Sequence, residues 1–148
     1  MTAAAGPLGT ADRLSIHELA GRYGNVIDDR DTAVRSIAVR PRSWDGLGRV
    51  FTEDAVFELR GLGPDERLQG LGAIRRKMAE STDHPVTHHV TNVGVHDDDD
   101  LVRLFFKLRG PGRRGRVGSA DYHDVVRREA HGWRICEHRV TLRTSPEG

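Results

Sequence analysis

Cysteine is almost absent from this sequence, because Cys136 is the only one among 148 residues. A lone cysteine excludes an intramolecular disulfide, which fits a reducing compartment such as the cytoplasm. Its surroundings, WRICEH, are typical of a strand, where a small buried thiol is more common than a nucleophile. We therefore expect a cytoplasmic protein whose thiol packs in the interior and does not react.

Long apolar runs and an excess of one charge are missing as well. No stretch approaches the roughly 20 apolar residues that a membrane span requires, and MTAAAGPLGT lacks the basic and apolar segments of a secretory signal. The 23 basic residues are balanced by 22 acidic ones. Without a strong overall field, neither nucleic acid nor a membrane surface is expected as a partner.

The length and the helical periodicities indicate a single domain. A chain of 148 residues suits one hydrophobic core. We predict a flexible N-terminus over 1–10 and one domain over 11–144. Apolar residues recur at helical spacing over 11–29 and again over 70–82, and residues 44–51 fit a short helical turn.

The remaining pattern predicts a sheet. A strand is expected over 55–60, and four more follow Pro85, separated by the turn-like stretches DDDD, GPGRRG and EAHG. In LVRLFFKLR one face is apolar, formed by Val102, Leu104, Phe106 and Leu108. This order predicts an α+β fold with helices on one side of a curved, mostly antiparallel sheet.

The stretch THHVTNVGVHDDDD, residues 87–100, raises the question of a metal site. His88 and His89 are adjacent on an expected strand, so their side chains point to opposite faces. No pair of histidines has the spacing of a known zinc or iron motif. We therefore expect no metal, and a hairpin turn at the aspartates.

Residue spacing alone leaves the chemical role of other polar groups open. Asp28 ends the first expected helix, where the helix dipole disfavours a carboxylate. It is either an ordinary polar residue or a partner for a histidine, and spacing alone favours the ordinary residue. Tyr122 and His123 alternate on a strand, so only one of them faces the interior, and Arg127 shares the face of His123.

Several segments together resemble a known family. In order, RYGNVIDDRD, FTEDAVFELRG, LQGLGAIRRKM, THHVTNVGV and YHDVVRREAHGWRICEHRV resemble the SnoaL-like family of the NTF2-like superfamily, over about residues 12–143. The resemblance implies a cone-shaped α+β barrel, in which a strongly curved sheet and about three helices enclose a pocket. Residues 32–43 are an insertion relative to that pattern. Proteins of this superfamily include cofactor-independent enzymes acting on hydrophobic small molecules, and homodimers are usual.

The resemblance also implies a catalytic pair. In its dehydratase and dehydrochlorinase branch a pocket histidine is the base and an aspartate of the first helix orients it. Those positions match His88, four residues before Asn92, and Asp28. We expect the pocket to be lined by Tyr23, Trp44, Phe51, Asn92, Phe106, Tyr122, His123 and Arg127.

The expected activity is proton transfer without a cofactor on a polyketide-like substrate. The reaction is cyclisation, dehydration or isomerisation, of the kind found in secondary metabolism and antibiotic biosynthesis. One alternative is epoxide opening, with Asp28, Arg127 and Asp121 around a water molecule. A second alternative is a non-catalytic binding or assembly module, because the fold also serves as a carrier and as a small oxygenase subunit.

Overall fold

The computed structural model of the chain describes residues 7–28, 44–61, 63–80, 88–98, 100–111 and 117–143. Three features expected from the sequence lie outside these ranges: residues 1–6 of the N-terminus, the insertion over 32–43, and most of the GPGRRG connection. The elements in chain order are α1 (Thr10–Ile27), η1 (Trp44–Arg49), β1 (Phe51–Arg60), β2 (Glu66–Gln69), α2 (Leu71–Glu80), β3 (His89–Asp98), β4 (Leu101–Pro111), β5 (Val117–Glu129) and β6 (Gly132–Arg143).

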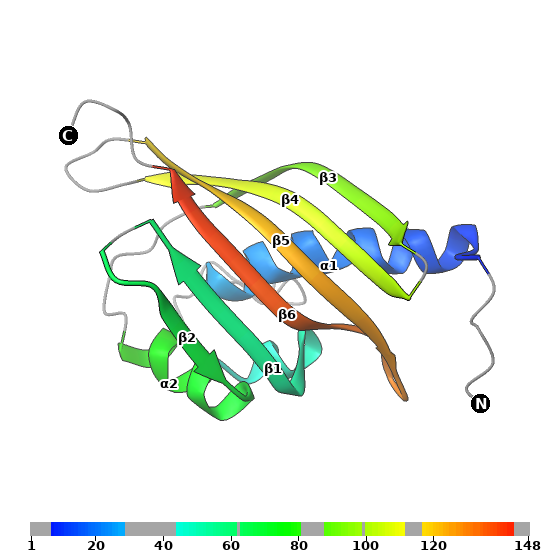
Figure 1. The fold of residues 1–148 in the computed structure, drawn as a ribbon, viewed down its shortest axis with the longest axis horizontal. Helices are drawn as coiled ribbons and strands as arrows, with labels where there is room; N and C mark the ends of the chain where they lie inside the picture. The colour runs from blue at the N-terminus through cyan, green and yellow to red at the C-terminus, as the bar shows by residue number, and fades with distance from the viewer. Residues whose placement is uncertain are drawn as a thin grey trace, which may run out of the picture.

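The strands form one six-stranded sheet in the order β2-β1-β6-β5-β4-β3. The pairing of β1 with β6 is parallel, and the other four pairings are antiparallel. Figure 1 shows the sheet curving over α1, with α2 beside β1 and β2 at the other side of the molecule. The expected α+β class is confirmed. The described residues contain two α-helices where about three helices were expected, because the segment over 44–49 is a 3-10 helix.

Helix α1 is held against the concave face of the sheet by its apolar side. Ile16, Leu19, Ala20 and Tyr23 are buried there, at the spacing that puts them on one helical face. In the first turn of α1, the Asp12 carboxylate accepts a hydrogen bond from Trp133 Nε1 at 3.1 Å and pairs with Arg128. The start of α1 is thereby tied to the β5–β6 hairpin.

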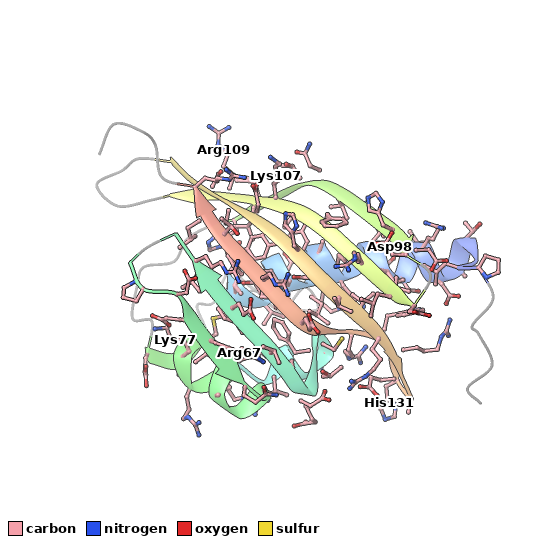
Figure 2. All side chains as sticks on the ribbon, viewed as in Figure 1. Arg67, Lys77, Asp98, Lys107, Arg109 and His131 are labelled. Atoms are coloured by element: carbon pink, nitrogen blue, oxygen red, sulfur yellow. The ribbon has the colours of Figure 1, made fainter. Side chains whose placement is uncertain are left out.

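Alternation along the long strands separates a dry face from a charged one. On β4, Leu104, Phe106 and Leu108 are buried against α1, whereas Lys107 and Arg109 are exposed. Figure 2 shows both cationic side chains projecting outward from the molecule. Strand β4 therefore contributes every second side chain to the core, as its sequence predicted.

Strand β3 departs from simple alternation at Asn92. Thr91 pairs with Lys107 and Gly94 pairs with Phe105, so β3 has one extra residue between these positions. Asn92 has a positive φ of 53°, a conformation that asparagine tolerates better than most residues. The bulge turns Val93 and Val95 toward the core beside Val90. Simple alternation would have placed Val93 and Val95 on the face opposite to Val90.

None of the described helices is both long enough and apolar enough to cross a membrane.

Candidate active site

Asp28 and His88 come together where α1 ends and β3 is about to begin. The backbone N–H of Asp28 continues the helix, donating to the carbonyl of Gly24 at 3.1 Å. The carboxylate accepts the backbone N–H of His88 through Oδ2 at 2.8 Å and contacts the imidazole Nδ1 through Oδ1. These two contacts offset the unfavourable position of a carboxylate at a helix C-terminus.

The two members of the pair differ in exposure. The Asp28 side chain is 6% exposed and the His88 side chain 25% exposed. An ionised carboxylate can only accept, so Nδ1 of the neutral imidazole carries the hydrogen and Nε2 keeps its lone pair. The arrangement leaves Nε2 as the free basic nitrogen of a partly exposed ring, whose orientation is held by Asp28.

Gly110, near the end of β4, makes room for this ring. A Cβ atom at that position would lie 2.8 Å from Cδ2 of His88 and 3.3 Å from Nε2. Since both distances are shorter than ordinary van der Waals contacts, any side chain there would displace the imidazole. Gly110 was not among the residues expected from the sequence, because its role depends on the pairing of β3 with β4.

Four of the expected pocket residues meet in the interior. Tyr23 lies with its ring centroid 6.0 Å from those of Phe51 and Phe106 and 5.4 Å from that of Tyr122. Phe106 and Tyr122 stack at 4.5 Å. The rings come from α1, β1, β4 and β5, and all four side chains are buried. Burial raises the pKa of Tyr23 and of Tyr122, so both phenols are protonated at neutral pH.

Two other expected residues lie on the outer face of the sheet. His123 is exposed and packs against Phe105 at a centroid distance of 5.0 Å. Arg127 is also exposed and donates to Asp54 at 2.8 Å and to Glu129 at 2.7 Å. Because Tyr122 faces inward, alternation places His123 outward, and Arg127 is on the outward side as well. Their assignment to the pocket is therefore wrong.

The remaining expected residues have different outcomes. Asn92 is exposed at the bulge of β3 and does not face the interior, so that assignment is also wrong. The side chain of Trp44 lies outside the described residues.

Asp121, which the epoxide-opening alternative requires, is held on the outer face by Arg143. Nε of Arg143 lies 2.8 Å from Oδ2 of Asp121. The structure thus does not assemble Asp28, Arg127 and Asp121 around one point, as epoxide opening would require.

A second His–Asp pair, Asp124 with His138, was missed from the sequence. Nδ1 of His138 lies 2.8 Å from Oδ1 of Asp124, and both side chains are fully buried. Burial raises the pKa of Asp124, and the adjacent His138 opposes that rise. Alternation carried a signal for this pair, since Asp124 is two residues from Tyr122 and His138 two residues from Val140 on predicted strands.

An open groove runs along the outside of the α1–β3 contact. Its volume is about 430 Å³, and its lining is His17, Glu18, Gly21, Arg22, Asn25, Val90 and Val93. Across the part of the chain that the structure describes, no three His, Cys, Asp or Glu side chains are grouped so as to hold a metal ion. The expectation that no metal or cofactor is used stays a prediction.

Comparison with known proteins places the chain in a family. The SnoaL-like domain matches residues 10–139. No curated protein matches. A candidate aromatic ring hydroxylase from Novosphingobium aromaticivorans is similar in structure, with 27% identity, a TM-score of 0.67, and 94% of each chain covered.

Two further solved structures share the fold. An NTF2-like protein of unknown function from Pseudomonas putida KT2440 has 16% identity and a TM-score of 0.69, over 95% of this chain and 93% of its own. A hexachlorocyclohexane dehydrochlorinase from Novosphingobium barchaimii LL02 has 17% identity and a TM-score of 0.65, over 90% and 88%. At these identities the likeness concerns the fold. The chain therefore belongs to the SnoaL-like family, within the NTF2-like superfamily.

Proposed function

We propose that this protein is a cofactor-independent enzyme of the lyase or isomerase type, in which His88 removes a proton from a hydrophobic small molecule. The observation that carries the proposal is the Asp28–His88 contact, with a buried carboxylate behind an accessible imidazole. Membership of the SnoaL-like family and the likeness to a dehydrochlorinase support the same class of reaction.

The proton transfer follows from the geometry of the pair. Nε2 of His88 takes a proton from a carbon or hydroxyl that is activated by a neighbouring carbonyl or leaving group. The imidazole becomes an imidazolium, whose positive charge is stabilised by the Asp28 carboxylate on Nδ1. General base catalysis of this kind typically contributes about 10²–10⁴-fold to the rate.

Tyr122 is the interior group best suited to assist. It faces inward, and its raised pKa keeps the phenol protonated, so it can donate a hydrogen bond to an oxygen that gains negative charge. Arg127, which points away on the outer face, has no part in this step.

Three reactions of a polyketide-like compound begin with such a proton transfer. They are cyclisation, dehydration and double-bond isomerisation.

The experiment measures proton removal directly. The protein is incubated in deuterated water with a panel of aromatic β-hydroxy and β-dicarbonyl compounds, and mass spectrometry follows deuterium uptake, loss of water and isomer formation. We expect His88→Ala to lower kcat/KM on an accepted compound by about 10²-fold or more. Asp28→Asn should lower kcat with little change in KM, because it affects the orientation and the charge of the base.

His89→Ala is the matched control. His89 is the exposed next residue, the first of β3, so its removal should leave kcat/KM unchanged. Unchanged turnover in both His88→Ala and Asp28→Asn would contradict the proposal. Binding of panel compounds without any exchange or conversion would instead favour the non-catalytic binding module.

A further inference from the structure

The Asp124–His138 pair has more hydrogen-bonding capacity than the described residues use. Its Nδ1–Oδ1 contact of 2.8 Å uses one side of each group. On the other side, Nε2 of His138 and Oδ2 of Asp124 are buried and have no hydrogen-bond partner among the residues that the structure describes. Buried polar atoms in proteins are nearly always partnered, so two such atoms on one pair require an explanation.

Core packing alone does not explain this pair. Replacing a buried ion pair with apolar side chains of similar volume is often neutral or stabilising. The sheet around Asp124 and His138 is otherwise lined with apolar residues, among them Leu104 and Val140. Stability therefore gives no general reason for such a pair, whereas its buried, unpartnered Nε2 is a group to which a ligand can bind.

The surroundings of His138 indicate the shape of the ligand. The imidazole centroid lies 4.6 Å from that of Tyr23, 5.1 Å from those of Phe51 and Tyr122, and 5.3 Å from that of Phe57. Aromatic rings from α1, β1 and β5 therefore surround a single polar edge. A flat apolar molecule that presents one polar group to the imidazole would pack against these rings.

A hydroxyl is the polar group that fits best. A hydroxyl both donates and accepts, so it can bond to Nε2 whether that nitrogen carries a hydrogen or a lone pair. We propose that Nε2 of His138 binds a hydroxyl at the inner end of the substrate, a planar apolar molecule. The identification of this ligand as the substrate rests on the proposed function, whereas the binding position itself does not.

The sheet register shows that the Asp124–His138 pair lies far from His88 along the strands. Asp124 is six residues along β5 from Gly118, which pairs with Gly110 beside His88. Six residues of strand span about 20 Å. The layers between contain Phe106 with Tyr122 and Leu108 with Ala120. A substrate that meets both histidines is therefore an extended molecule of several rings, and its entry requires the intervening aromatic rings to change rotamer.

The test uses β-naphthol and naphthalene, two probes that differ by one hydroxyl. Water solvates the hydroxyl, so a purely apolar site would favour naphthalene. We expect the full-length protein to bind β-naphthol about tenfold more tightly, as measured by calorimetry, because the hydroxyl satisfies a buried nitrogen. His138→Asn should abolish this preference, since asparagine keeps an amide N–H for Asp124 near the place of Nδ1 and has nothing at Nε2.

His123→Asn is the matched control, because it makes the same substitution on the outward-facing histidine of β5 and should keep the preference. The proposal is overturned if naphthalene binds as tightly as β-naphthol, if His138→Asn keeps the preference, or if neither probe binds. If His138→Asn does not fold, nitrogen NMR of the protein without substitutions tests the proposal. β-Naphthol should then shift the His138 Nε2 resonance, and an unmoved resonance at saturation overturns the proposal.

The two proposals fail separately. Asp28→Asn and His88→Ala should lose turnover and keep the preference for β-naphthol, because neither residue touches His138. If those variants keep full turnover, the proposed function fails while the hydroxyl position stands. If the preference is absent and the variants lose turnover, only the hydroxyl position is refuted.

Discussion

The chain has only two tyrosines, and both lie in the aromatic interior. Burial is the main cause that raises the pKa of Tyr23 and of Tyr122 above the ordinary value near 10. Because both rings are buried, their absorbance reports directly on the core. It also links the protonation of two residues to the stability of the whole fold.

We expect the folded protein to show no tyrosinate absorbance at a pH where free tyrosine is half ionised. The folded pKa values are raised, so above pH 10 the unfolded chain has fewer bound protons than the folded one. The free energy of unfolding therefore falls as pH rises beyond 10, and tyrosinate absorbance should appear together with loss of the circular dichroism signal. A gradual rise in absorbance near pH 10, with the fold intact, would show that at least one ring is solvated.

At the scale of elements, the position of His88 depends on β4 as much as on β3, which begins at the next residue. The imidazole lies beside Gly110, where a Cβ atom would come within 2.8 Å of Cδ2. Asp28 holds the opposite side of the ring from α1. Contacts from α1, β3 and β4 thus determine where Nε2 of His88 points, and a substitution in β4 should alter catalysis although Asp28 and His88 are both kept.

Gly110→Ala should lower kcat/KM by displacing the His88 ring, and it should cost about 1–3 kcal/mol of unfolding free energy through overpacking. Gly72→Ala, on α2, is the control: a Cβ atom there has no neighbour within 4 Å. It should leave turnover intact and stabilise the protein slightly, because alanine has less freedom in the unfolded chain. Denaturant unfolding and the deuterium assay measure both effects. Equal activity in the two variants would mean that β4 does not position His88.

At the scale of the whole molecule, the outer face of the sheet is covered by ion pairs. Asp54 accepts from Arg127 at 2.8 Å, and Asp121 from Arg143 at 2.8 Å. Hydrogen bonds from Arg127 lower the pKa of Asp54 to about 2, and those from Arg143 lower the pKa of Asp121. Because both carboxylates have lowered pKa values in the folded protein, the stability of the fold depends on pH in the acid range.

A folded pKa below the unfolded value of 3.8 means that these pairs stabilise the protein above that pH. The stabilisation is lost as pH falls from about 4 toward the folded pKa of about 2 for Asp54. We expect the melting temperature to fall over this window, and Asp54→Asn to remove a small part of the fall, below about 1 kcal/mol, because the pair is exposed and screened. If the melting temperature of Asp54→Asn follows the same pH profile, the contact between Asp54 and Arg127 does not contribute to stability.

Local pattern was enough to predict much of this protein. The apolar periodicity of α1 and α2 and the alternation of β4 follow from side-chain geometry within one element, so the α+β class could be predicted from the sequence. The resemblance to the SnoaL-like family singled out Asp28 and His88, which lie sixty positions apart in the sequence and which spacing alone did not connect. The structure places these two side chains in contact.

What the sequence by itself determined was the position of both α-helices and of the long strands, together with the apolar face of β4. Which residues of β3 and β5 face the interior was decided only by the tertiary structure. The phase of alternation depends on pairing with neighbouring strands, and one bulge residue shifts it. Hence Asn92, His123 and Arg127 lie outside the pocket, while Asp124 and His138, fourteen residues apart on paired strands, meet in the core.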